Sequence, residues 1–98
     1  MEAIKRLGVL HTFDYSNNTL PLHLTESIVA MLNKFGMLNI LCLDHCEMSD
    51  AICKQIFKNI NNQQLQFLNI SWNNLSGDSL EDIVRILELN PDLQKLAM

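Results

Sequence analysis

The chain has 98 residues, 48% of them hydrophobic, with three Gly and two Pro, which excludes a disordered or fibrous polymer and fits one small domain. Its net charge of −4 at pH 7 argues against a surface that tracks phosphates, because nucleic-acid binding depends on clustered Lys and Arg. We therefore expect no nucleic acid among its partners.

The N-terminal segment, MEAIKRLGVLHTFDYS, has no apolar run that ends in a small-residue cleavage site, and no later stretch reaches 18 consecutive apolar residues. We expect neither export nor binding to a membrane. The three cysteines, Cys42, Cys46 and Cys53, are an odd number and favour a reducing compartment over a disulfide framework. The predicted location is cytoplasmic.

Four segments share one hydrophobic pattern. They begin at Leu10, Leu38, Leu65 and Leu93, at spacings of 28, 27 and 28 residues, and read LHTFDYSNNTL, LNILCLDHCEM, LQFLNISWNNL and LQKLAM. Each fits L-x-x-L-x-L-x-x-N/C-x-L, a repeat built from a short strand and a helix. The alternation predicts that the fourth and sixth positions are buried, while the third, fifth and seventh face the other side of a sheet.

The ninth position of the pattern holds Asn18, Cys46 and Asn73. The chain is expected to turn away from the strand there, which leaves buried backbone groups in need of partners. An Asn side chain can supply both a donor and an acceptor, and Cys46 fills the same place with weaker hydrogen bonding.

A second periodic set follows each of the first three segments, with the i, i+3, i+4, i+7 spacing of one buried helix face. Its members are Thr25, Ile28, Val29 and Leu32; Cys53, Ile56, Phe57 and Ile60; and Leu80, Ile83, Val84 and Leu87. We expect Ser49 and Asp50, then Ser76 and Asp78, to cap the second and third helices, with Thr25 as the candidate in the first. Glu81 and Arg85 are expected to form an i, i+4 surface pair.

The 28-residue unit, the full-length helix and the Asn, Cys, Asn series resemble the ribonuclease-inhibitor-like subclass of leucine-rich-repeat proteins. The resemblance covers nearly the whole chain. It implies an α/β fold, a right-handed leucine-rich-repeat solenoid or horseshoe with a parallel β-sheet on the concave face and α-helices on the convex face. Ribonuclease inhibitor, NOD-like receptors, tropomodulin and Ran GTPase-activating protein share this scaffold, so the scaffold alone does not define one function.

The register divides the chain into a single array. Residues 1–9 are predicted to end a preceding repeat, with Ile4 as its last buried position. Residues 10–37, 38–64 and 65–92 are full repeats, and residues 93–98 start a truncated one. Solenoids need atypical polar repeats at their ends to seal their cores, and neither end of this pattern has one. We therefore expect a fragment of a longer solenoid. The alternative is a complete small protein that is marginally stable or hides its uncapped ends by self-association.

Zinc-type ligands lie close together at Cys42, Asp44, His45, Cys46 and Glu47. The register points their side chains in different directions, so we predict no metal site and no cofactor. Cys42 and His45 share a strand edge without an oxyanion hole or a closed pocket, and we predict that the chain is not an enzyme. A hydrolase or metal enzyme would need bound zinc or a low-pKa thiol at Cys42.

Rows of side chains are predicted on the concave sheet face, where repeat proteins commonly bind. The predicted partner-binding residues are Trp72, Phe67, Ile40, His45, Asp44, Asp14 and Asn69. Three of them are large apolar groups that the fold does not need there, and exposed aromatic groups are enriched in binding hot spots. The alternative is that Phe67 and Trp72 pack on one another or on neighbouring units to shield the sheet.

These features predict an intracellular protein–protein interaction scaffold that binds a protein partner on a pre-organised sheet face. The alternative function is that of a purely structural or sensor segment of a larger regulatory protein. Such a protein could be an NOD-like receptor, a GTPase regulator, a cytoskeletal or axonemal protein, or a bacterial effector.

Overall fold

The computed structural model describes residues 11–34 and 37–98, so the predictions for residues 1–9 and for Leu10 lie outside the described residues. The described chain forms one four-stranded parallel sheet in the order β1-β2-β3-β4. The strands are β1 (Thr12–Asp14), β2 (Ile40–Cys42), β3 (Phe67–Asn69) and β4 (Lys95–Ala97). The helices between them are α2 (Thr25–Lys34), α3 (Asp50–Phe57) and α4 (Leu80–Leu89), and the 3-10 helices η1 (Leu22–Leu24) and η2 (Gly77–Ser79) precede α2 and α4. The predicted α/β class with a parallel sheet is confirmed.

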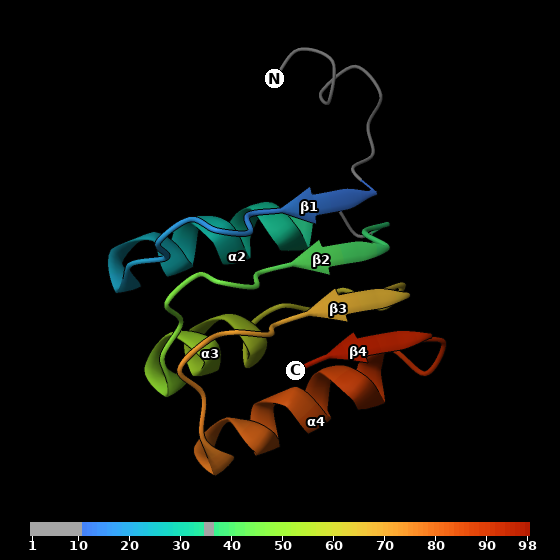
Figure 1. Cartoon of the computed structure of the whole chain (residues 1–98). Coiled ribbons are helices and arrows are strands. Elements are labelled where there is room, and N and C mark those ends of the chain that lie inside the picture. The colour runs from blue at the N-terminus through green and yellow to red at the C-terminus, as the bar shows by residue number, and fades with distance from the viewer. Residues whose placement is uncertain (1–10, 35–36) are drawn as a thin grey trace.

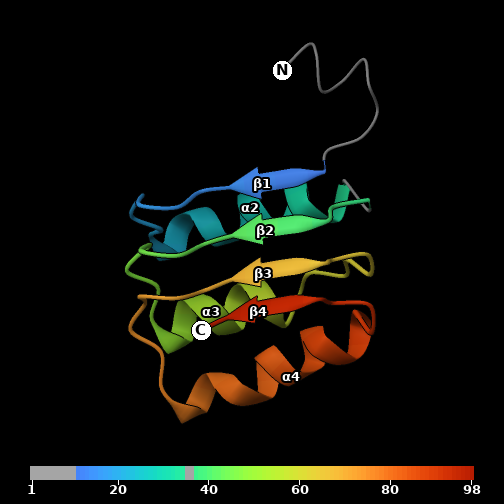
Figure 2. The ribbon, with the colours of Figure 1, turned by 45° about the vertical axis from the view of Figure 1, so that its right-hand side comes forward.

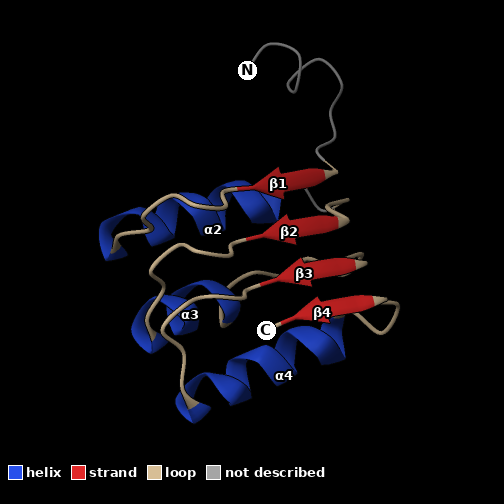
Figure 3. Cartoon of the chain, viewed as in Figure 1, coloured by secondary structure: helices blue, strands red, loops and turns tan. Residues whose placement is uncertain are grey.

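The three α-helices lie on one side of the sheet, and each strand lies beside the next strand of the chain (Figures 1 and 2). Strands and helices alternate along the whole described chain (Figure 3). Thr12 pairs with Ile40, Ile40 with Phe67, and Phe67 with Lys95. Residues at the same position of the 11-residue pattern are therefore lateral neighbours in the sheet.

The core lies between the sheet and the helices. Leu41 and Leu68, the central residues of β2 and β3, are fully buried. Their neighbours in each strand are half-buried, as expected when successive side chains point to opposite faces. Each fully buried Leu or Ile stabilises the fold by about 1.5–3 kcal/mol relative to an exposed one. In the first unit burial is weaker, because Phe13 and Tyr15, at the fourth and sixth positions of the pattern, are only half-buried. Their ring centroids lie 6.2 Å apart.

The Asn73 side chain joins two neighbouring turns. Its Oδ1 accepts from the backbone N–H groups of Cys46 and Met48, both at 2.9 Å. Its Nδ2 donates to the carbonyl oxygens of Leu43 at 2.8 Å and Ile70 at 3.0 Å. The predicted double role of Asn at the ninth position, as donor and acceptor, is confirmed in this unit.

In the preceding unit Cys46 stands at the position of Asn73 and makes only part of these bonds. Its thiol donates to the carbonyl oxygen of Tyr15 at 3.3 Å, which is the counterpart of the bond from Asn73 to Leu43. A thiol is a weak acceptor, and the backbone N–H of Leu20 donates instead to the carbonyl oxygen of Cys46 at 3.1 Å. The Cys unit is thus held by weaker side-chain bonds than the Asn unit.

The predicted buried face of the third helix is partly wrong. Leu80 is 55% exposed and Val84 is 41% exposed, whereas Cys53 and Phe57 at the matching positions of α3 are fully buried. The reason is tertiary: α4 packs against α3, and no described helix lies on the other side of α4 (Figure 1). Met98, at a position expected to be buried, is likewise 65% exposed.

The expected pair between Glu81 and Arg85 is also wrong. Arg85 reaches across to the end of α3, where its Nη1 donates to the carbonyl oxygens of Phe57 at 2.8 Å and Ile60 at 2.9 Å. Its Nη2 donates to Asn61 Oδ1 at 3.0 Å. The last carbonyl groups of a helix have no partner within it, and a cation at that end also interacts favourably with the helix dipole. Arg85 therefore joins two helices.

Ser49 caps α3 as predicted, since its side chain accepts from the N–H of Ile52. Asp50 does not cap its own helix. Its carboxylate accepts from the backbone N–H of Ser76 at 2.9 Å and from the hydroxyl groups of Ser76 at 2.6 Å and Ser79 at 2.5 Å. These bonds, the Ser76 hydroxyl first, hold the pKa of Asp50 below its ordinary value. Asp50 thus ties the start of α3 to the turn before α4.

The other predicted caps differ in detail. Ser76 caps η2 by accepting from the backbone N–H of Asp78 at 3.2 Å, so the carboxylate of Asp78 is not the capping group. In the first unit η1 follows Pro21 without a side-chain cap, and the Thr25 hydroxyl donates to the carbonyl oxygen of Leu22 at 2.8 Å. The first unit therefore lacks the side-chain acceptor that Ser49 provides for α3 and Ser76 for η2.

Burial of Cys53 makes stability sensitive to alkaline pH. Burial raises the pKa of the Cys53 thiol from 9.0 to about 11. Between these values the unfolded chain loses the proton and the folded chain keeps it, so stability is retained below pH 9 and falls as pH rises towards 11. Two pKa units correspond to a loss of roughly 2–3 kcal/mol. Urea unfolding at pH 8, 9, 10 and 11 measures this decline.

Cys53→Ala is the comparison for this experiment, because it removes the thiol and leaves every other titrating group. We expect the variant to be less stable at pH 8 and to lose less stability than the original chain as the pH rises. Parallel stability curves for the two proteins would show that Cys53 does not titrate in this range.

Candidate functional site

The candidate site is the sheet face turned away from the helices, which we call the open face. It consists of Thr12, Asp14, Ser16, Asn17, Ile40, Cys42, Asp44, His45, Phe67, Asn69, Ser71, Trp72, Lys95 and Ala97. The three large apolar residues predicted there differ in exposure. Ile40 and Phe67 are half-buried lateral neighbours, and Trp72 is 78% exposed.

Trp72 follows β3 in a left-handed backbone conformation, with φ of 59°. The residues at the same position of the two preceding units share this conformation, with φ of 64° at Asn17 and 55° at His45. For a bulky side chain it costs about 1 kcal/mol or more. The bonds of Asn73, next in the chain, hold the turn in place. The fold therefore fixes an aromatic side chain in an exposed position.

The Trp72 ring stacks on His45. The two ring centroids are 5.5 Å apart and the planes are inclined by 15°. Each of the two aromatic residues thus contacts a neighbouring unit, which is one of the two predicted ways of packing: Trp72 contacts His45, and Phe67 contacts Lys95. The Nζ of Lys95 lies 5.5 Å from the centroid of the Phe67 ring, within range of a cation–π contact.

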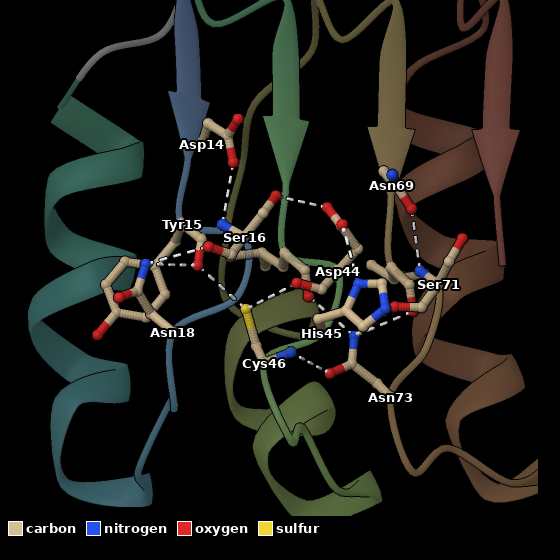
Figure 4. A network of polar contacts seen from close by, with 12 residues as sticks. Asp14, Tyr15, Ser16, Asn18, Asp44, His45, Cys46, Asn69, Ser71 and Asn73 are labelled. Carbon is tan, nitrogen blue, oxygen red and sulfur yellow. Dashed lines mark hydrogen bonds and ion pairs between the residues drawn. The ribbon is translucent and has the colours of Figure 1, made fainter.

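Polar side chains join the first two units where their strands end (Figure 4). Asp44 Oδ1 accepts from the Ser16 hydroxyl at 2.5 Å, and Asp44 Oδ2 lies 3.3 Å from His45 Nδ1. Asp14 Oδ1 accepts from the backbone N–H of Ser16 at 2.9 Å. The bond from the Ser16 hydroxyl is the main reason that the pKa of Asp44 lies below its ordinary value. Asp44 is therefore a carboxylate at neutral pH.

The third unit repeats part of this network. Asn69 Oδ1 accepts from the backbone N–H of Ser71 at 3.0 Å, as Asp14 does from Ser16 (Figure 4). In the middle unit Cys42 stands at the position of Asp14 and Asn69, and Asp44 stands at the position of the two serines. Because of this exchange, the carboxylate of Asp44 accepts a hydrogen bond from Ser16, which follows the neighbouring strand β1.

Cys42 has the opposite chemistry to an activated nucleophile. Burial raises the pKa of its thiol above the ordinary value, and the negative charges of Asp14 and Asp44 raise it further. Activated thiols have lowered pKa values, usually beside a cation. Over residues 11–34 and 37–98, no group of three or more His, Cys, Asp or Glu side chains is arranged to hold a metal ion.

The structure brings together only some of the predicted site residues. Asp14, Asp44, His45 and Trp72 lie near the carboxyl ends of the strands and, with Ser16, form a connected series of hydrogen bonds and a ring stack. Ile40 and Phe67 begin β2 and β3, at the other ends of the strands, while Asn69 makes its own turn bond to Ser71. Ser16 and Lys95 also lie on the open face, although they were not among the predicted partner-binding residues. The repeat pattern places them in the rows on that face without indicating their contacts.

The described chain thus consists of successive strand–helix units, and the open face of their sheet carries polar and aromatic side chains. No family model matches the chain. The chain is similar to a mouse protein (Mus musculus), NACHT, LRR and PYD domains-containing protein 14, with 36% identity over 63 residues. The similar region covers 62% of this chain and 6% of the mouse protein.

Among the described helices, none has the length and apolar character that a membrane crossing requires.

Proposed function

We propose that this chain is a stretch of a ribonuclease-inhibitor-like leucine-rich-repeat array, and that it serves as a protein-interaction scaffold inside the cell. The proposal is supported by the lateral pairing of residues at equal pattern positions, such as Ile40 with Phe67. The partial similarity to a mouse protein whose name includes LRR domains agrees with it. In this proposal the strand–helix units are consecutive turns of a horseshoe, and the open face is its concave side.

The observation that carries the binding function is the exposure of Trp72, which is 78% accessible although its backbone is held in a costly conformation. The stack on His45 and the turn bonds of Asn73 fix it before any partner arrives. Less side-chain freedom is then lost on association, which favours binding. Exposed Trp residues are enriched among the side chains that dominate binding energy.

The double substitution Trp72→Ala with Phe67→Ala is expected to abolish retention of a protein partner in affinity capture from cell extract. Truncation of a hot-spot aromatic residue costs about 2 kcal/mol or more of binding free energy, roughly a 30-fold loss of affinity. Quantitative mass spectrometry of the captured proteins is the measurement. Far-ultraviolet circular dichroism checks that the helices remain.

The matched control is Leu22→Ala with Val84→Ala, which removes two exposed apolar side chains from the helical part of the chain. A partner that binds the open face stays with the control protein and is lost from the Trp72 and Phe67 variant. Retention by both variants, or loss from both, contradicts the assignment to the open face.

The second candidate function is that of a structural or sensor segment in a larger regulatory protein. It is favoured by the similarity to a relative whose name combines LRR with NACHT and PYD domains and of which the chain covers 6%. The gene sequence on both sides tests this candidate. A nucleotide-binding domain upstream would favour it, and further repeats alone would favour a scaffold.

A further inference from the structure

The open face has an uneven distribution of charge. Of the five described Lys and Arg residues, four lie on helices or directly after one, at Lys34, Lys54, Lys58 and Arg85. The fifth, Lys95, lies on β4 and faces the Phe67 ring. At the carboxyl ends of β1 and β2 lie the carboxylates of Asp14 and Asp44, with His45 Nδ1 3.3 Å from Asp44 Oδ2, and Glu47 follows beyond the turn. This part of the open face is therefore negative.

We propose that the open face binds an extended, arginine-bearing segment of a protein partner, with arginine side chains at Asp14 and Asp44 and against Trp72. This inference rests on the proposed function and specifies the chemistry of the partner. Charge complementarity selects a basic segment, and the exposed indole of Trp72 adds a flat surface on which a cation can stack.

The carboxylates are oriented for this role. Ser16 lies between them, with its N–H on Asp14 and its hydroxyl on Asp44, so both are held on the same part of the face (Figure 4). Asp44 Oδ1 accepts from Ser16 and Asp44 Oδ2 contacts His45, and carboxylate oxygens have further lone pairs for a guanidinium. A hydrogen bond to a charged guanidinium is stronger than one between neutral groups.

Arginine fits this surface better than lysine. Its planar guanidinium pairs with a carboxylate through two parallel bonds and stacks on an aromatic ring, whereas an ammonium group is a compact, strongly hydrated charge. In an extended segment alternate side chains lie on the same side, about 7 Å apart. A segment with arginine at alternate positions can therefore present two of them to the face.

The test uses the full 98-residue chain, labelled with ¹⁵N, and the peptide acetyl-Gly-Arg-Gly-Arg-Gly-amide. Trp72 is the single Trp of the chain, so it gives one indole N–H resonance. We expect saturable shifts of this resonance and of the backbone amides of Ser16 and Asp44. The matching lysine peptide should bind more weakly, and the matching glutamate peptide should cause no saturable shift.

Asp14→Asn with Asp44→Asn should weaken binding of the arginine peptide about tenfold. Asn keeps a side-chain oxygen for the bonds from Ser16, so the turn is preserved. The control is Asp78→Asn with Asp92→Asn, which removes two exposed carboxylates elsewhere and changes the net charge equally. Its affinity should match that of the original chain.

Equal affinity of the two double variants would overturn the proposal, and so would equal binding of the lysine or glutamate peptide. Absence of saturable shifts with the arginine peptide at millimolar concentration would overturn it as well. Affinity capture separates this failure from that of the proposed function. If the Trp72 and Phe67 variant still loses its partner, the open face binds a protein of different chemistry.

Discussion

Asn73→Ala is expected to lower the free energy of unfolding by about 3–5 kcal/mol. The substitution leaves the N–H groups of Cys46 and Met48 and the carbonyl groups of Leu43 and Ile70 without their side-chain partner. An unpaired buried backbone group costs about 1–3 kcal/mol, and solvent reaches part of this turn. Since small domains have total stabilities of about 5–15 kcal/mol, the loss is large. Urea unfolding followed by circular dichroism measures it.

Two further variants separate the side-chain bonds of Asn73 from other effects. Asn74→Ala alters an exposed side chain next to it and should change stability by less than about 0.5 kcal/mol. Asn73→Cys introduces the residue that the middle unit uses, which retains a weak donor and loses the strong acceptor. We expect an intermediate loss for it. If Asn73→Ala and Asn74→Ala are equally stable, the turn does not depend on the Asn73 bonds.

Phe57→Ala is expected to destabilise the chain by about 3–5 kcal/mol, because it leaves a cavity at the largest fully buried side chain among the described residues. Phe57 ends α3 and lies within the hydrophobic core. Its carbonyl group is also the acceptor for Arg85, so the surrounding backbone is tied to α4 and has little freedom to close the cavity. Chemical unfolding measures the loss.

Val84→Ala provides the comparison at the matching position of the next unit. Val84 is 41% exposed, so truncation should cost less than about 1 kcal/mol. The contrast tests whether a neighbouring helix decides burial at this position of the repeat. Similar losses for Phe57→Ala and Val84→Ala would contradict that explanation.

The candidate site could be located from sequence more readily than it could be described. The repeat register places Asp44, His45 and Trp72 in adjacent rows, and it identifies Trp72 as a large group without a role in the core. It does not reveal that the turn before Asn73 is left-handed, that His45 stacks on Trp72, or that Ser16 holds Asp44. These contacts join residues about 28 positions apart, and their geometry depends on how closely neighbouring units pack.

Local patterns in the sequence predict the unit length, the strand positions, the buried row through Leu41 and Leu68, and the role of Asn73. Each follows from local periodicity or from the needs of backbone groups at a turn. Packing between units, in contrast, explains why Arg85 binds the end of α3 and not Glu81, and why Asp50 binds the following turn. It likewise decided that Leu80 is exposed while Cys53 is buried. Equal positions in a repeat have equal burial only where a neighbouring unit covers them. A long polar side chain binds the acceptors that packing places around it, such as the three oxygen atoms near the end of α3 that accept from Arg85.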